Sequence, residues 1–533
     1  MDFRGEVWKI VVKSNILIKF CVSEERNVKD MNLKEILVGL EGIKARGNID
    51  LDITNVDSDS RNIKENGMFI AIHGFETDGI KFIPDAIKNG AKVIMVDANT
   101  NLKELNLPED ITLLVVPDTR IALAVAACNF YNNPSKKFKL IGVTGTKGKT
   151  TTTFMIKKIL EKAGHKVGLI GTIAVYIGDK KIKDSARTTP ESIELQKIFA
   201  DMVNENVDVV VMEVSSQSLK LNRVYGCDFD IGVFTNFSHE HISEKEHPDM
   251  EDYFASKLKL FEMCKTAYVN ADDIYAAKAG REIKTPEITT YGIDNFCHIL
   301  AKDITITNSY VDFKLKIDGK NERVKTCIPG RFSVYNSLAA ICVAKKLGAN
   351  AEQIKEALVE VRVPGRSELV DNKKDLTIMI DYAHTPESLE SILRAVKSYT
   401  KGRVISVFGC GGDRDKLKRP LMGEVSGIVA TNTIITSDNP RTENPEEIVK
   451  EIEAGIKKTT GQYTCIVDRK EAIKQAIKMA SKSDMIVLAG KGHEPYQEIN
   501  GQKYPFDERI IVKEIIEEVI KEEKEKIGKK KKK

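Results

Sequence analysis

The sequence predicts an α/β protein of three domains in series: a small N-terminal α/β domain, a central domain built on a parallel sheet, and a C-terminal domain of the Rossmann type. The chain has 533 residues, more than a single hydrophobic core usually accommodates. With 42% hydrophobic and 30% charged residues, its composition is that of an ordinary globular protein. From about residue 31 onward, short apolar runs alternate with helical patterns, which is typical of α/β folds.

The composition excludes several other classes of protein. With 35 Gly and 15 Pro the chain is neither collagen-like nor wholly disordered, and no stretch of 18 residues is free of charge, so we expect no membrane-spanning helix. Lys9, Lys13 and Lys19 interrupt the apolar residues at the start. We therefore predict no signal peptide and expect the protein in the cytoplasm. The nine cysteines form no CxxC pair, so we expect reduced, mostly buried thiols.

The charge distribution gives little reason to expect a nucleic-acid partner. The formal net charge is +4, and the five lysines at positions 529–533 alone exceed that value. We interpret residues 521–533 as a charged, lysine-rich tail, and we expect its terminal lysine run at 529–533 to be a solvated, disordered end. We predict neither nucleic-acid binding nor membrane insertion.

The N-terminal domain is predicted at residues 31–138. Residues 1–30 show no periodicity that continues into the helical pattern beginning at Met31, so we place them outside the fold. A polar segment at 132–139 separates this domain from the next. Its predicted strands lie at 68–74, 91–97 and 112–116, and its predicted helices at 80–90 and 120–133.

The other two domains repeat the alternation of strand and helix. The central domain, at residues 139–362, opens with a strand, a glycine-rich turn and a helix, and the C-terminal domain spans residues 363–520. The central strands are predicted at 139–143, 207–214, 231–237 and 266–271, with the helix at 151–164. The C-terminal strands are predicted at 376–383, 403–409, 432–438 and 484–490.

A phosphate-binding loop is predicted at residues 142–150, which read GVTGTKGKT between a buried strand and a helix. Glycines let backbone N–H groups close on phosphate oxygens, and the helix N-terminus adds positive potential. Lys149 can reach the terminal phosphates, and Thr150 can ligate Mg²⁺. Val143 stands where the general GxxxxGK[ST] pattern has its first glycine. We predict that this central, P-loop ATPase-like domain binds a nucleoside triphosphate.

Many segments resemble, in the same order, motifs of the Mur ligases and of the related folylpolyglutamate synthetases, which join an amino acid to a carboxylate at the expense of ATP. The resemblance covers about residues 31–511. Besides the loop GVTGTKGKTTT, the matching segments are DSRNIKENGMFIAIHG, TTPES, MEVSSQSLKLNRV, TNFSHEHI, YFASKLKLF, PGRFSVYNSLAA, DYAHTPESL, GCGGDRDKLKRPLMG, SDNPRTENP and GKGHE.

Within the family, the chain is most similar to members that add meso-2,6-diaminopimelate to the D-glutamate side-chain carboxylate of UDP-N-acetylmuramoyl-L-alanyl-D-glutamate, in peptidoglycan precursor synthesis. The resemblance implies an ADP-forming ligase that uses ATP and Mg²⁺, works through an acyl phosphate and is a monomer. Its two other substrates would be the UDP-muramoyl-dipeptide and meso-diaminopimelate. Two alternatives stay open: a sibling ligase that adds L-lysine, and, more remotely, a P-loop regulator or a nucleic-acid-stimulated ATPase.

The resemblance also implies the roles of residues around the phosphates. Lys149, Glu213, His241 and Lys257 would be catalytic, and Lys257 matches the family's carbamylated lysine. The metal ligands would be Thr150, Glu213, His241 and the modified Lys257. The nucleotide contacts would be Gly145, Thr146, Lys147, Gly148, Lys149, Thr150, Thr151, Asn336 and Asp381, with Asn270 as a further candidate. The sequence departs from the family in two places, with Gln217 where His is common and His239–Glu240 where Gln–Asp is frequent.

The remaining implied contacts belong to the two acceptor substrates. Ser60 would contact the UDP part, and Arg441 would bind the distal carboxylate that distinguishes diaminopimelate from lysine. Glu494 would bind the distal ammonium. The contacts to the muramoyl-dipeptide would be Thr188, Thr189, Ser215 and Arg223. Those to diaminopimelate would be Arg414, Asp438, Asn439, Pro440, Arg441, Gly490 and Glu494.

Overall fold

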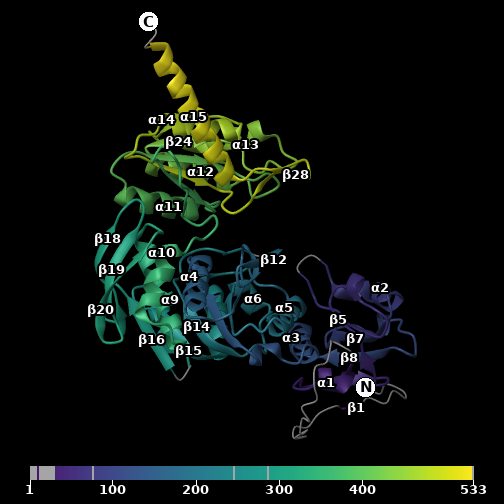
Figure 1. Ribbon diagram of the computed structural model, residues 1–533. Helices are drawn as coiled ribbons and strands as arrows, with labels where there is room; N and C mark the ends of the chain where they lie inside the picture. The colour runs from purple at the N-terminus through teal and green to yellow at the C-terminus, as the bar shows by residue number, and fades with distance from the viewer. Residues whose placement is uncertain (1–8, 11–29, 75–76, 244–245, 285–286, 531–533) are drawn as a thin grey trace. The chain divides into compact units, whose positions relative to one another are not determined.

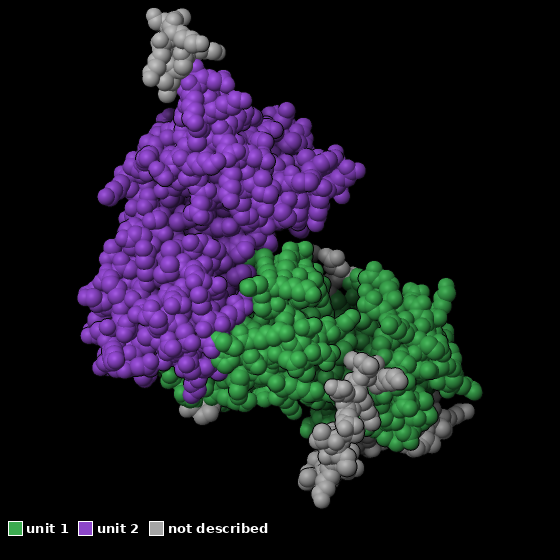
Figure 2. Space-filling model, in the orientation of Figure 1, with its two compact units in different colours: residues 1–149, 164–290 green, residues 150–163, 291–533 purple. Residues whose placement is uncertain are grey.

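The computed structural model describes residues 9–10, 30–74, 77–243, 246–284 and 287–530 (Figure 1). The chain forms two compact units, which Figure 2 distinguishes by colour. Unit 1 comprises residues 1–149 and 164–290, and unit 2 comprises residues 150–163 and 291–533. Three domains of mixed α/β architecture can be followed along the chain, as predicted, each built around its own sheet.

The N-terminal sheet of unit 1 has six strands in the order β1-β3-β8-β7-β6-β5. Strands β5 to β8 are parallel, whereas β3 runs antiparallel to β8. Strands β6 and β8 are fully buried, which explains their continuous apolar sequences. Strands β2 and β4 pair with each other in a separate two-stranded sheet. The strands of both sheets are β1 (Lys9–Ile10), β2 (Met31–Asn32), β3 (Lys44–Arg46), β4 (Asp52–Ile53), β5 (Val56–Asp57), β6 (Gly67–Ile70), β7 (Ala91–Asp97) and β8 (Thr112–Val116). The helices are α1 (Leu33–Ile36), α2 (Ile83–Lys88) and α3 (Thr119–Phe130), with 3₁₀ turns η1 (Ser60–Asn62), η2 (Gly79–Phe82), η3 (Leu102–Glu104) and η4 (Pro134–Lys136).

The prediction that residues 1–30 lie outside the fold is wrong for Lys9 and Ile10. These two residues pair with Ala45 and Lys44 and add strand β1 to the edge of the sheet. An edge strand such as β3 offers unpaired backbone groups, and a short extended segment can bind them whatever its side-chain pattern. Periodicity therefore gave no signal here. The remainder of residues 1–29 lies outside the described part of the chain.

The central sheet of unit 1 has strands in the order β12-β11-β10-β13-β9-β14-β15-β16. Strands β10, β13, β9, β14 and β15 are parallel, and the predicted strands are confirmed as β9, β13, β14 and β15. Glu213 at the end of β13 pairs with Val143, so the polar residues that follow these strands share one edge of the sheet with the phosphate loop. The strands are β9 (Lys139–Thr144), β10 (Val167–Ile170), β11 (Ala174–Ile177), β12 (Lys180–Asp184), β13 (Val209–Glu213), β14 (Phe229–Phe234), β15 (Cys264–Asn270) and β16 (Glu287–Gly292). The helices are α5 (Ser192–Asn204), α6 (Ser216–Lys220), α7 (Met250–Glu262) and α8 (Ile274–Glu282).

Unit 2 contains the C-terminal sheet, with strands in the order β21-β22-β26-β23-β24-β25. All neighbours are parallel except β21, and one apolar cluster packs on each face of the sheet. The four predicted strands are confirmed as β22, β23, β24 and β26. The strands of the unit are β17 (Ile299–Leu300), β18 (Lys302–Ile306), β19 (Val311–Ile317), β20 (Lys320–Thr326), β21 (Glu368–Leu369), β22 (Thr377–Asp381), β23 (Val404–Phe408), β24 (Asn432–Ile435), β25 (Gln462–Cys465), β26 (Met485–Ala489), β27 (Tyr496–Ile499) and β28 (Gln502–Pro505). Its helices are α4 (Lys149–Lys162), α9 (Arg331–Lys346), α10 (Ala351–Glu360), α11 (Pro386–Tyr399), α12 (Lys418–Val429), α13 (Pro445–Ile456), α14 (Arg469–Met479) and α15 (Glu508–Lys530).

The predicted tail at residues 521–533 is helical as far as Lys530, because α15 continues through it. Glu522 pairs with Lys474 and Lys478, and Glu523 pairs with Lys374. These ion pairs connect the first turn of the predicted tail to neighbouring segments. The prediction of a disordered end is therefore wrong for Lys529 and Lys530, which belong to α15, and residues 531–533 lie outside the described part of the chain.

The predicted domain boundaries at 138/139 and 362/363 do not coincide with the boundary between the two compact units, so they remain predictions. The eight cysteines in the described part of the chain are all free thiols, and five of them are buried, as expected. In that same part, no helix is both long and apolar enough to cross a bilayer.

Candidate active site

The phosphate loop follows β9 and leads into α4. Gly145 has φ = +142° and Gly148 has φ = +85°, conformations that favour glycine. A Cβ atom on Gly145 would also collide with the hydroxyl of Thr235. The ammonium of Lys149 donates to the carbonyls of Gly145 and Thr146, each at 2.9 Å. The loop therefore has the tight backbone that a phosphate cradle needs, with its lysine folded back over it.

Asn236, after β14, holds the loop in this conformation. Its carbonyl accepts from the N–H of Thr146 at 2.9 Å, and its side-chain oxygen accepts from the N–H of Lys147 at 2.9 Å. In unit 2, Thr150 and Thr151 open α4 and are buried. The predicted nucleotide contact Asn336 accepts from the hydroxyl of Thr152 on α4, at 3.4 Å.

Lys257 on α7 is buried beside the loop. Its Nζ donates to the carbonyl of Gly145 at 3.0 Å and lies 4.4 Å from the ring centroid of Tyr253. Burial, together with the charge of Lys149, lowers the pKa of the Lys257 amine well below its usual value. A buried amine that has lost its proton can react with CO₂, so the environment suits the expected carbamate. Tyr253 itself contacts the loop through Thr146, whose hydroxyl lies 3.1 Å from the phenol oxygen.

The two other expected metal ligands make separate contacts. Glu213 is 1% exposed, and its carboxylate accepts from the backbone N–H of Thr172 at 2.8 Å and from the Thr172 hydroxyl at 3.1 Å. His241 has φ = +61°, and its Nδ1 lies 2.7 Å from the carboxylate of Glu246. Over the residues that are described, no group of three or more His, Cys, Asp or Glu side chains is arranged to hold a metal.

The residues expected to hold the muramoyl-dipeptide come together near the end of β13. The Thr189 hydroxyl accepts from the N–H of Ser215 at 3.1 Å, and Arg223 donates to the Thr189 carbonyl at 3.3 Å. The hydroxyl of Thr188 lies 3.1 Å from that of Thr172, which contacts Glu213. Arg223 is buried and forms an ion pair with Glu191 at 2.9 Å. The structure therefore joins four expected substrate residues to the expected metal ligand Glu213.

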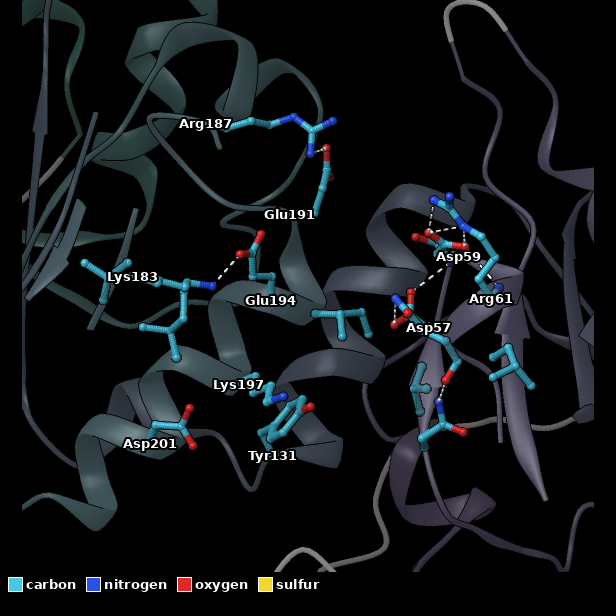
Figure 3. Close-up of a pocket in the computed structure, with 18 of the residues that line it drawn as sticks. Asp57, Asp59, Arg61, Tyr131, Lys183, Arg187, Glu191, Glu194, Lys197 and Asp201 are labelled. Carbon is cyan, nitrogen blue, oxygen red and sulfur yellow. Dashed lines mark hydrogen bonds and ion pairs between the residues drawn. The ribbon is translucent and has the colours of Figure 1, made fainter. Parts of the chain in front are cut away.

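A cavity of about 1040 Å³ lies in unit 1 between segments of its two sheets (Figure 3). Positive and negative side chains line it in similar numbers, and several of them pair with one another, such as Arg61 with Asp59. Ser60, the expected UDP contact, does not line this cavity. Its side chain is buried in η1, and its carbonyl accepts from Asn89 at 2.9 Å.

The residues expected to bind diaminopimelate come together in unit 2, at the carboxyl ends of β24 and β26. The amide of Asn439 donates to Glu494 at 2.8 Å, and its oxygen accepts from Lys491 at 3.0 Å. Gly490 has φ = +111°, and a Cβ atom there would lie 2.7 Å from a carboxylate oxygen of Asp438. That oxygen is buried and has no hydrogen-bond partner among the described residues, so it remains available to a ligand.

Arg441 is held on two sides. Its Nε donates to the carboxylate of Glu498 at 3.1 Å, and its Nη1 donates to the carbonyl of Gly412 at 2.7 Å. Arg441 follows Pro440 and has φ = +52°, and its backbone bridges to Ile499 in the β27–β28 hairpin. The side chain of Arg414 is exposed.

Asp381 and Asn270 take part in internal hydrogen bonds. The Asp381 carboxylate accepts from the backbone N–H groups of Ser367 at 2.8 Å and Ala383 at 3.0 Å, and burial raises its pKa. Asn270 donates to the Thr235 carbonyl at 3.0 Å. Their expected nucleotide contacts remain predictions.

Sequence reasoning missed several residues that support the site. Lys491 is fully buried between Asn439 and Glu494, and Glu498 holds Arg441. His247, fully buried, lies between the Ser216 hydroxyl at 2.9 Å and Asp252 at 2.6 Å. Lys491 stands inside the GKGHE motif, which was a usable signal, but the partners of Glu498 and His247 are distant in sequence.

The glycine-rich phosphate loop that connects β9 to α4 identifies a P-loop nucleotide-binding protein of α/β architecture. The chain belongs to the Mur ligase family and is a ligase. Residues 52–131 match the family's catalytic domain model, 143–344 the Mur ligase middle domain, and 365–492 the glutamate ligase domain.

Individual relatives agree with this assignment. The chain is 51% identical over 489 residues to UDP-N-acetylmuramoyl-L-alanyl-D-glutamate–2,6-diaminopimelate ligase of Caldanaerobacter subterraneus, covering 92% of this chain and 99% of the relative. It is 47% identical to ligase 1 of the same name from Clostridium acetobutylicum, covering 92% and 100%. A solved structure of a ligase of this name matches with a TM-score of 0.66 and 29% identity, covering 92% of this chain and 99% of that chain.

Proposed function

We propose that this ligase adds meso-2,6-diaminopimelate to the D-glutamate side-chain carboxylate of UDP-N-acetylmuramoyl-L-alanyl-D-glutamate, with conversion of ATP to ADP and phosphate. The relatives named above carry this activity in their names. The observation that carries the proposal is the placement of Arg441, whose guanidinium is held by Glu498 and Gly412 beside the Asn439–Glu494 pair.

The chemistry requires an activated carboxylate, because a free carboxylate is a poor electrophile. The γ-phosphoryl group of ATP moves to the D-glutamate side chain and gives an acyl phosphate, with ADP as the leaving group. The amine of diaminopimelate then attacks the acyl carbon, and phosphate leaves. The loop N–H groups and Lys149 would hold the phosphates of ATP during the first step. Asn336 and Asp381 remain proposed nucleotide contacts.

Mg²⁺ fits the donor chemistry at the edge of the central sheet. Its ligands would be the Thr150 hydroxyl, the Glu213 carboxylate, the His241 imidazole and a carbamate on Lys257. When bound, the ion would neutralise charge on the transferred phosphoryl group. Lys257 suits carbamylation because its pKa is lowered, and addition of CO₂ to the neutral form of the amine with loss of one proton would give a metal-binding carbamate anion.

The UDP-muramoyl-dipeptide would bind along unit 1. Thr188, Thr189, Ser215 and Arg223 form a joined cluster of hydroxyls with one guanidinium, which suits an anionic dipeptide. The cavity of Figure 3 provides room for the nucleotide-sugar part. Ser60 remains a proposed UDP contact, although its side chain is buried and does not line that cavity.

The distal end of diaminopimelate would be bound by opposite charges in unit 2. The distal carboxylate would pair with Arg441 and Arg414, and the distal ammonium with Glu494, whose pKa is raised by burial. Asp438, Asn439, Pro440 and Gly490 would complete the site. Lysine lacks the distal carboxylate and would leave the half-buried guanidinium of Arg441 with its protein partners alone.

The decisive experiment is a panel of amino acids assayed for phosphate release with the UDP-muramoyl-dipeptide and ATP, with mass detection of the UDP-linked product. The proposal expects turnover with meso-diaminopimelate and little with L-lysine. Preferred use of lysine would support the sibling ligase, and ATP turnover that does not depend on amino acids would contradict both.

We further propose a cytoplasmic monomer, since ATP and UDP-linked substrates are cytoplasmic. Light scattering of the purified protein tests the oligomeric state.

A further inference from the structure

Arg419 is a fully buried arginine that lies outside every role assigned above. It is the second residue of helix α12 and lies within the segment DRDKLKRP. None of its side chain is exposed to solvent. A buried guanidinium is costly unless its donors are paired. Both Nη groups are paired, whereas Nε has no hydrogen-bond partner among the described residues. The partners of the Nη groups lie on segments that carry proposed amino-acid-binding residues and on helix α13.

The main partner of Arg419 is Glu443. The two side chains form a forked pair, with Nη1 and Nη2 each 2.9 Å from a different carboxylate oxygen. Nη1 also donates to Glu451 on α13 at 2.7 Å, and Nη2 donates to the carbonyl of Gly411 at 3.2 Å. The fork lowers the pKa of Glu443 to about 2, and the pair remains charged at neutral pH.

These contacts fasten two loops to each other. Gly411 belongs to the loop after β23, which carries Arg414, whereas Glu443 belongs to the loop after β24, which carries Arg441. Glu443 also accepts from the backbone N–H of Asp413 at 2.6 Å, so this single carboxylate holds both loops.

Further hydrogen bonds between the loops depend on the same alignment. The N–H of Gly412 donates to the Asn439 carbonyl at 2.9 Å, and the Thr442 hydroxyl donates to Asp413 at 2.7 Å. A Cβ atom on Gly412 would overlap the carbonyl of Pro440, so the two backbones are in close contact. The Gly412 carbonyl in turn accepts from Arg441.

We infer that Arg419 and Glu443 are positioning residues for the amino-acid site: their forked ion pair fixes the distance between the loop that carries Arg414 and the loop that carries Asn439 and Arg441. The inference rests on the proposed function, because those three residues are the proposed contacts to diaminopimelate. Two guanidinium groups can bind one carboxylate only if their loops keep a fixed spacing, and small displacements at such a site reduce binding strongly.

The test compares Arg419→Lys and Glu443→Gln with the matched control Glu451→Gln. Lysine keeps the charge but cannot form the fork, and glutamine at 443 removes the charge from the fork. Glu451 contacts Arg419 from α13 and has no described contact to either loop, so its replacement leaves the forked Arg419–Glu443 pair in place. Each protein is assayed as the full chain with ATP, the UDP-muramoyl-dipeptide and meso-diaminopimelate.

We expect the KM for diaminopimelate to rise about ten- to a hundredfold in both test variants, while the KM values for ATP and the UDP-muramoyl-dipeptide change less than about threefold. The control should match the parent. Backbone amide hydrogen exchange, measured without substrates, should accelerate in residues 411–414 and 439–443 and remain unchanged in the strands of the same domain.

Two outcomes would overturn the inference. In the first, the KM for diaminopimelate and the exchange of both loops stay at the parent values in folded variants. In the second, all three KM values rise together while exchange accelerates throughout the domain, which would show a general stabilising role. The exchange measurement needs no substrate, and the parent's amino-acid panel is measured separately. Failure of the proposed function is therefore recognised by the panel, and failure of this inference by the variants.

Discussion

Arg441 donates through Nε to the carboxylate of Glu498, 3.1 Å away on strand β27. The arginine proposed to recognise the distal carboxylate is thus oriented by a side chain 57 residues further along the chain. Its Nη1 is held by the carbonyl of Gly412. With Nε and Nη1 committed, the guanidinium has a fixed direction before substrate arrives, which favours selectivity because less side-chain freedom is lost on binding.

The first prediction concerns this selectivity. Arg441→Ala should weaken transition-state binding with meso-diaminopimelate by about 2–5 kcal/mol, the range for breaking a buried, hydrogen-bonded charge pair. Activity with L-lysine should fall far less, because lysine has no distal carboxylate for Arg441 to bind. The measurement is the ratio of kcat/KM for the two amino acids in parent and variant. Arg394→Ala, at an exposed pair on α11, is the control. Equal losses with both amino acids would mean that Arg441 supports the loop and does not recognise the substrate.

The second prediction concerns the phosphate loop. Lys149→Ala should reduce product formation by about 10²–10³-fold, because an electrostatic contact to the transferred phosphoryl group is lost. The melting temperature should stay close to that of the parent, since the Lys149 ammonium bonds carbonyls of its own loop. Lys158→Ala, on the same helix, pairs with Glu360 and should leave the rate unchanged. A variant at position 149 that retains near-parental turnover would remove Lys149 from the mechanism.

Much of the fold followed from the sequence because buried parallel strands are nearly continuous apolar runs. Strands β9, β13 and β14 fit this rule. The glycines of the phosphate loop also mark the end of β9. The pairing of Lys9 with Ala45 did not follow, because backbone pairing at a sheet edge leaves no side-chain pattern. The length of α15 was likewise missed, because its contacts, such as that of Glu523 with Lys374, join residues that are distant in sequence.

The site was predictable where one short segment carries the chemistry and obscure where distant segments meet. Motifs identified Asn439 and Arg441, which lie in a single loop. They could not identify Glu498 or Arg419, whose importance comes from contacts with that loop in three dimensions. For Ser60 the motif predicted a substrate contact, yet the side chain is buried in a 3₁₀ turn. A motif fixes which residues are present and leaves open which way each side chain points.

The third prediction concerns the N-terminal segment. Deletion of residues 1–30 removes strand β1, which has two residues and pairs only with β3 among the described residues. We expect a loss of about 1–2 kcal/mol in the free energy of unfolding, as for one or two hydrogen bonds, measured by urea denaturation. Turnover should be unchanged, because the residues that line the cavity and form the phosphate loop all lie at position 55 or later, outside the deleted segment. Loss of activity in the folded, shortened protein would show that the segment contributes to the site. Removal of residues 531–533 serves as the control.

The fourth prediction is a pH dependence. Arg419 lowers the pKa of Glu443 from 4.5 to about 2 in the folded protein. A carboxylate with a lowered folded pKa stabilises the protein above the unfolded pKa, and that stabilisation is lost as the pH falls from about 4.5 towards 2. The unfolding free energy should therefore fall less over this range in Glu443→Gln than in the parent. Glu446→Gln, at an exposed position on α13, should follow the parent. Parallel curves for parent and Glu443→Gln would contradict the assigned ion pair.

The fifth prediction concerns Lys257, which is 1% exposed and has a pKa well below its usual value. A buried amine with a lowered pKa suits carbamylation, and the carbamate would place a negative charge next to the phosphate loop. Lys257→Ala should therefore lose activity and regain part of it when formate or acetate is added, because a small carboxylate can occupy the place of the carbamate. Depletion of CO₂ should lower the activity of the parent but leave that of the variant unchanged. The control is Lys259→Ala, two residues further along α7, which should keep its activity and gain nothing from carboxylates. If no carboxylate restores the variant and CO₂ depletion leaves the parent unaffected, Lys257 acts as an unmodified amine. Its function would then be to hold the phosphate loop through its hydrogen bond to the Gly145 carbonyl.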